Sequence, residues 1–99
     1  MKRFVEVHYT VKDGMRESFY HALQESGIPA ASRAESGNEK YEYYFHPENE
    51  NELLLLEIWT PPEAAEQHMQ TAHFKKLGEL KQEYVTNTAF RRFEFPDEG

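Results

Sequence analysis

LLLLEIWTPPEAAEQHMQTAHF, residues 53–74, combines one strand with the starts of two helices. Residues 53–60 have the apolar composition and length of a strand. Thr60-Pro61-Pro62-Glu63 then supplies an N-cap hydroxyl, proline in the first turn and a glutamate three residues after the cap. This pattern predicts a capping box and a helix over residues 61–69. Thr71 can cap a second helix directly afterwards.

The sequence before this segment predicts two more strands and one helix. Residues 4–11 alternate with the period of a half-buried strand. Asp13 can cap the helix that follows, and Gly27 ends it. One face of the strand carries Val5, Val7, Tyr9 and Val11, the other carries Phe4, Glu6, His8 and Thr10, and the apolar stripe of the helix is Met15, Phe19, Ala22 and Leu23.

The middle and the end of the chain complete the element order. Residues 30–40 are small and polar and predict a loop, whereas residues 41–46 are rich in aromatics and predict a strand that forms a hairpin with residues 53–60. Residues 88–95 alternate again and predict the last strand, with a tail from Pro96. The helix that Thr71 can cap has an apolar stripe made of Phe74, Leu77, Leu80, the stem of Lys81, Tyr84 and Val85.

The predicted order is therefore βαββααβ, which is an α+β fold of the ferredoxin-like kind. It gives a four-stranded antiparallel sheet with the helices on one face, in a single domain over residues 1–99. The other face needs a partner, and an identical sheet is the simplest one. We expect that open face to carry Phe4, Leu53, Leu55 and Trp59 among Glu6, His8 and Glu57.

Composition excludes several classes of function. The 99 residues carry a formal net charge of −7, which disfavours nucleic acid and anionic membranes as partners. There is no cysteine, so disulfides, thiolate catalysis and cysteine-based metal sites are excluded. No apolar run is long enough for a signal peptide or a membrane span. By default we expect a cytoplasmic protein.

Several motifs resemble the antibiotic biosynthesis monooxygenase family. They are Leu54-Leu55-Leu56-Glu57-Ile58-Trp59-Thr60, Ala64-Ala65-Glu66-Gln67-His68, His73-Phe74 and Arg33-Ala34-Glu35-Ser36-Gly37-Asn38. The likeness in element order extends over residues 2–95. The resemblance implies a dimeric α/β barrel, that is, a homodimer formed through the sheet faces, with one pocket per subunit between sheet and helices.

The resemblance alone leaves several activities open. The family includes cofactor-free oxygenases of phenolic substrates, haem-degrading enzymes and members without established activity. Haem-degrading members carry asparagine, tryptophan and histidine where this chain has Val7, His68 and Gly78. We therefore expect no haem degradation. The expected function is a cofactor-independent monooxygenase, an oxidoreductase acting on a small aromatic or quinol-like molecule. The alternative is a dimeric binding protein of the same fold without catalysis.

His68 and His73 are the candidate catalytic residues. A histidine near a pocket can accept a phenolic proton, because its ordinary pKa of about 6.5 lies close to working pH. The structural alternative is that His68 bonds a carbonyl at a helix end and His73 packs in the next helix. No third ligand follows at a recognisable spacing, although Glu66 and His46 could converge with the two histidines, so no metal is expected.

The candidate pocket residues are expected on the face of the sheet that the helices cover. Trp59 could stack on a flat substrate or fill the dimer interface, and the interface is favoured if the helices cover the side of the strand that carries Leu54. The predicted lining consists of Val7, Tyr9, Tyr43, Ile58, Trp59 and Phe74.

Overall fold

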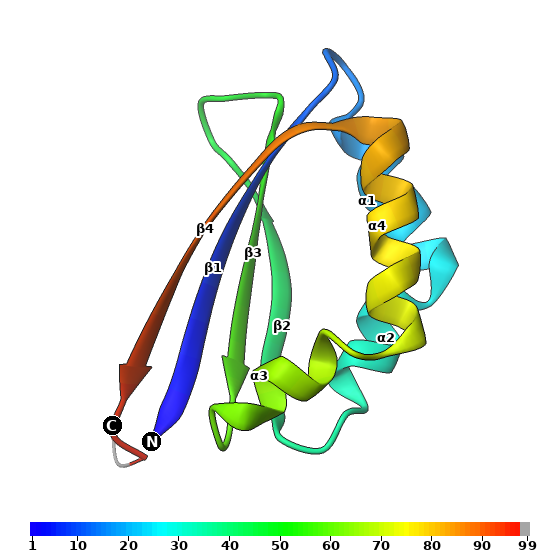
Figure 1. Ribbon diagram of the computed structural model, residues 1–99. Helices are drawn as coiled ribbons and strands as arrows, with labels where there is room; N and C mark the ends of the chain where they lie inside the picture. The colour runs from blue at the N-terminus through cyan, green and yellow to red at the C-terminus, as the bar shows by residue number, and fades with distance from the viewer. Residues whose placement is uncertain (98–99) are drawn as a thin grey trace.

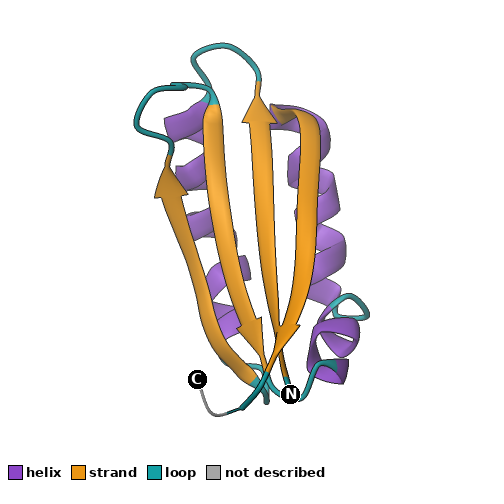
Figure 2. Cartoon of the chain, turned by 90° about the vertical axis from the view of Figure 1, so that its left-hand side faces the viewer, coloured by secondary structure: helices purple, strands orange, loops and turns teal. Residues whose placement is uncertain are grey.

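A computed structural model describes residues 1–97, which contain four strands and four helices. The strands form one antiparallel sheet in the order β2-β3-β1-β4. All helices lie on the same face of it (Figures 1 and 2), so the predicted α+β, ferredoxin-like architecture is confirmed. In chain order the elements are β1 (Lys2–Val11), α1 (Arg16–Ser26), α2 (Ile28–Arg33), β2 (Asn38–Phe45), β3 (Glu52–Trp59), α3 (Glu63–His68), α4 (Ala72–Tyr84) and β4 (Val85–Phe95).

One helix, α2, lies where a loop was predicted. Gly27, at φ 80°, ends α1 and directly precedes α2. Ile28 and Pro29 are buried in the first turn of α2 and anchor it, and Ser32 is buried one turn later. Because small polar residues follow this anchor, the sequence pattern indicated a loop in place of a helix. The helix matters for the site because it sets where the next residues, including Glu35, meet the rest of the domain.

The predicted capping box is wrong, whereas the predicted cap of the next helix is confirmed. Pro62 is the N-cap of α3 and no side chain bonds its first turn. The Thr60 hydroxyl instead donates to the carboxylate of Glu39 beside it. At α4 the Thr71 hydroxyl accepts a hydrogen bond from the Phe74 amide at 3.2 Å.

The register of the sheet decides which side chains face the helices. Val7 pairs with Leu55 and Tyr9 with Leu53, and directly opposed residues point to the same face. The predicted faces of β1 are confirmed, but the predicted faces of β3 are wrong. Four consecutive leucines show no alternation, so the sequence did not fix this register. Leu53, Leu55, Glu57 and Trp59 are buried under the helices, whereas Leu54, Leu56 and Ile58 are only partly buried on the open face.

The core fills the layer between α1 and the sheet. Phe19 and Leu23 of α1 are fully buried. The Phe19 ring packs edge to face on Tyr9, with centroids 5.5 Å apart, and also contacts Tyr84 of α4. The helices α3 and α4 cover the remaining part of the sheet, where a cavity remains.

Residues 96–97 follow β4 as the start of the predicted tail, and the rest of that tail, Glu98 and Gly99, lies outside the described residues. Within residues 1–97, no helix combines the length and the apolar composition needed to cross a membrane.

We expect Gly37→Ala to lower the free energy of unfolding by about 3 kcal/mol, from positive-φ strain and overpacking. Gly37 has φ 95°, and an added Cβ would lie 2.5 Å from the Thr60 carbonyl oxygen and 2.8 Å from the Ala64 Cβ. The matched control is Gly27→Ala, which has φ 80° but open space around it and should cost only about 1 kcal/mol. Urea unfolding of both variants measures the difference. Equal losses would contradict a tight contact at Gly37.

Candidate functional site

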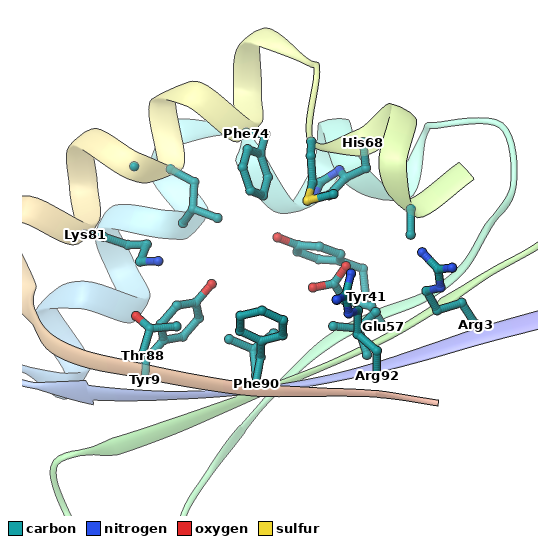
Figure 3. A pocket seen from close by; sticks show the side chains of 16 residues that line it. Arg3, Tyr9, Tyr41, Glu57, His68, Phe74, Lys81, Thr88, Phe90 and Arg92 are labelled. Atoms are coloured by element: carbon teal, nitrogen blue, oxygen red, sulfur yellow. The ribbon is translucent and has the colours of Figure 1, made fainter. Parts of the chain in front are cut away.

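A cavity of about 350 Å³ lies between the sheet and helices α3 and α4. Its walls are mainly apolar and aromatic, with Val5, Val7 and Tyr9 of β1 on the sheet side and Phe74 and Leu77 of α4 on the helix side. Figure 3 shows the Glu57 carboxyl group and the Tyr41 hydroxyl pointing into this space. Volume and composition are typical of a small-molecule site.

Among the described residues, Glu57 is the one acidic side chain that lines the cavity. It is only 7% exposed, and one carboxyl oxygen accepts a hydrogen bond from the Trp59 indole N–H at 2.8 Å. Burial raises the pKa of Glu57 to about 7; the Trp59 bond opposes this rise and the negative charge of Glu35 adds to it. A carboxyl group with such a pKa can take up or release a proton near neutral pH.

The phenols beside Glu57 stay neutral. Burial raises the pKa of Tyr41 to about 12 and that of Tyr9 well above its ordinary value. Both therefore remain protonated at physiological pH and offer hydroxyl groups to a ligand.

His68 links the cavity to a second polar group, the Glu35 carboxylate. One Glu35 oxygen lies 2.5 Å from His68 Nδ1 and 2.7 Å from His73 Nε2. His68 ends α3 and is packed against Trp59, with ring centroids 4.8 Å apart. Burial lowers the pKa of His68, and its bond to Glu35 acts in the opposite direction. His68 lines the cavity, whereas His73 and Glu35 lie behind it, outside the lining.

Cationic side chains surround the cavity. Figure 3 shows Lys81 at one end and Arg3 at the other. Arg3 is neutralised by Glu94, at 2.8 Å, and by Glu66. Within residues 1–97, neither Lys81 nor Arg92 has a carboxylate within salt-bridge distance. Burial lowers the pKa of Lys81. The wall therefore offers positive charge to an anionic ligand, despite the net charge of −7.

The structure brings together part of the predicted site. Val7, Tyr9, His68 and Phe74 line the cavity, as does Gly78. Tyr43, Trp59 and His73 do not belong to the lining.

Ile58 lies on the open face opposite Phe4, because the helices cover the opposite face of β3 from the predicted one. For the same reason Trp59 is fully buried on the covered face and cannot fill an interface at the open face. Two suggested metal partners also lie elsewhere: Glu66 bonds Arg3, and His46 accepts from the amides of Glu48 and Asn49.

Sequence reasoning missed Glu57 and Glu35. Glu57 was assigned to the open face through the same error in the facing of β3. Glu35 is 33 residues from His68 and 38 from His73, so no local spacing signalled their contact.

The fold and the cavity define a ferredoxin-like α+β domain with a mainly apolar cavity between sheet and helices. Residues 3–80 match the sequence model of the family described as antibiotic biosynthesis monooxygenase, and the chain belongs to this family. No curated protein matches the chain in sequence.

Solved structures share the fold over nearly the whole chain. A protein from Nitrosomonas europaea described as a candidate antibiotic biosynthesis monooxygenase is 17% identical, with a TM-score of 0.87 over 98% of this chain and 92% of that one. A conserved protein of unknown function from Bacteroides thetaiotaomicron is 26% identical, with a TM-score of 0.83 over 95% and 97%. A conserved protein from Methanosarcina mazei is 25% identical, with a TM-score of 0.84 over 95% and 92%.

Glu57→Gln should remove a pH dependence of stability. A pKa raised from 4.5 to about 7 means that the native state holds a proton that the unfolded chain releases. The wild type therefore loses stability as pH rises from 4.5 to 7, by at most about 3 kcal/mol, and stays at the lower level above pH 7. The melting temperature of the variant minus that of the wild type should be larger at pH 8 than at pH 5. A constant difference between the two proteins would refute the raised pKa.

Proposed function

We propose that the protein is a cofactor-independent monooxygenase that acts on a small aromatic, quinol-like substrate in the cavity between the sheet and helices α3 and α4. The observation that carries this proposal is the buried Glu57 carboxyl group, with a pKa of about 7, in a mainly apolar wall. Membership of the antibiotic biosynthesis monooxygenase family supports the reaction type.

Glu57 is the proposed base. A phenol has an ordinary pKa of about 10, so its proton leaves readily only to a positioned acceptor. The resulting anion is electron-rich and donates an electron to O2, and apolar walls keep water away from the intermediates. A hydroquinone and O2 give a hydroxyquinone and water, so the substrate supplies all the electrons and no cofactor is required.

The cavity suits a flat ligand with negative charge. Tyr41, Phe74 and Phe90 supply aromatic surfaces, and a volume of about 350 Å³ accommodates a small ring system. Lys81 and Arg92 lie in the wall and stabilise the anion that forms when the phenolic proton leaves.

The two predicted catalytic histidines differ in position. We propose that His68 contacts the substrate, because its ring lines the cavity while Nδ1 is occupied by Glu35. His73 reaches the substrate only through Glu35 and His68, so we propose a positioning role for it.

We also propose a homodimer formed through the open face of the sheet, which Figure 2 shows free of helices. Phe4 and Phe93 pack together there, with centroids 6.2 Å apart. Leu54, Leu56 and Ile58 of β3 extend this apolar surface and are only partly buried. A second copy would cover the apolar area that the chain leaves exposed.

Oxygen uptake with a panel of hydroquinones tests the reaction. Glu57→Gln should lower the rate at least about 100-fold, because general-base catalysis contributes factors of this size. The exposed Glu63→Gln on α3 is the matched control and should leave the rate unchanged. His68→Asn should lower the rate at least about tenfold, and His73→Asn less than His68→Asn. Uptake no faster than buffer across the panel would contradict the oxygenase proposal; ligands that raise the melting temperature without turnover would then indicate a binding protein.

Phe93→Glu tests the dimer against a control on the same strand. Phe93 lies on the open face opposite Phe4 and is 47% exposed, whereas Phe90 lies on the cavity side opposite Val7 and is 58% exposed. Sedimentation at micromolar concentration should show a dimer for the wild type and for Phe90→Glu, and a monomer for Phe93→Glu, because a charge would be buried in the interface. A wild-type monomer under these conditions would rule the dimer out.

A further inference from the structure

We propose that Glu35, His68 and His73 bind a divalent transition-metal ion of the zinc class. The ligand atoms would be one carboxylate oxygen of Glu35, Nδ1 of His68 and Nε2 of His73. A carboxylate oxygen or ring nitrogen from each residue lies within 4.8 Å of those of the other two. This inference does not rest on the monooxygenase proposal, because it is argued from the contacts among Glu35, His68 and His73, and only His68 of these lines the cavity.

The convergence joins three separate parts of the fold. Glu35 follows α2, His68 ends α3 and His73 lies in the first turn of α4. One Glu35 oxygen is 2.5 Å from His68 Nδ1 and 2.7 Å from His73 Nε2. Both histidines therefore direct a nitrogen at the same Glu35 oxygen. An ion bound to all three groups would lie between these atoms, with the oxygen moved back from the two nitrogens.

A second histidine–carboxylate cluster shows that such convergence is not general in this chain. His8 contacts Glu6 through Nε2 at 2.5 Å and Glu52 through Nδ1 at 2.8 Å. The two carboxylates thus lie on opposite sides of one ring and do not share a point. Within residues 1–97, only the Glu35 cluster brings three such ligand atoms together.

The ligand set favours a particular class of ion. Imidazole nitrogen suits zinc and the neighbouring transition metals, whereas magnesium and calcium prefer oxygen ligands. Zinc binds nitrogen and carboxylate oxygen at about 2.0–2.2 Å, and three protein ligands leave a coordination position open for water. Ligand atoms within 4.8 Å need only a small adjustment to surround such an ion.

The surroundings hold the ligands in place while leaving a path for the ion. Thr71 caps α4 and its hydroxyl donates to the His68 carbonyl at 2.7 Å, so it fixes the turn between the two histidines. Trp59 packs on the His68 ring. The His68 side chain is 4% exposed, whereas those of Glu35 and His73 are 15% and 20% exposed, so an ion can enter from their side.

Binding requires both rings to coordinate the ion as neutral imidazoles. The hydrogen that each ring carries toward Glu35 moves to its other nitrogen, and the freed lone pair coordinates the ion. In that state His68 Nε2 carries the hydrogen and can donate it to a ligand, which leaves Glu57 as the base of the cavity.

The test uses protein without a histidine tag, stripped with EDTA and titrated with ZnCl2 by calorimetry. We expect one equivalent of zinc per chain in the wild type, and binding at least about tenfold weaker in Glu35→Gln, His68→Asn and His73→Asn, since each removes one ligand. The matched control is His8→Asn, which alters the other cluster and should bind zinc as the wild type does. Circular dichroism confirms that each variant is folded, and His73→Asn, at the most exposed ligand, keeps the test valid if His68→Asn unfolds.

The melting temperature gives a second readout. Zinc should raise it in the wild type and in His8→Asn but not in the double variant His68→Asn/His73→Asn, because an ion that binds only the native state stabilises it. Absence of stoichiometric binding, unchanged affinity in His73→Asn, or equally tight binding of MgCl2 would overturn the proposal. Oxygen uptake by EDTA-stripped protein separates this outcome from failure of the monooxygenase proposal.

Discussion

The antiparallel pairing of β3 with β1 sets the side chains that the helices cover, and the chemistry of the cavity depends on it. Val5 pairs with Glu57 and Val7 with Leu55, so one carboxyl group enters a layer that is mainly apolar. A register shifted by one residue would place Leu56 or Ile58 there and turn Glu57 toward the open face. The cavity would then lack the Glu57 carboxyl group, and the open face would carry an additional carboxylate.

Burial of Glu57 lowers stability, yet the same burial gives the group its useful pKa. A carboxyl group at the surface would remain ionised at neutral pH and would be a weak base. Trp59 limits the penalty by donating one hydrogen bond, and its ring also packs on His68. The cavity carboxyl and the Glu35 cluster are thus connected through one aromatic side chain and one imidazole.

Much of the fold could be predicted from local patterns, whereas the site could not. The alternation in β1 and the Thr71 cap are signals within a few residues, and both are found in the structure. The predicted facing of β3 was wrong because its four leucines show no alternation. Helix α2 was not predicted because its buried anchor precedes a polar stretch. Glu35 and Glu57 owe their properties to contacts and burial that only the assembled chain creates, so no spacing in the sequence marks them.

Trp59 is the single tryptophan of the chain, and its position has a practical consequence. Its indole bonds Glu57 on one side and lies 4.8 Å from the His68 ring on the other. The tryptophan fluorescence of the protein therefore originates from one point between the two polar groups. An experimenter can observe this region optically without attaching a label, because the emission of no other indole is superimposed on it.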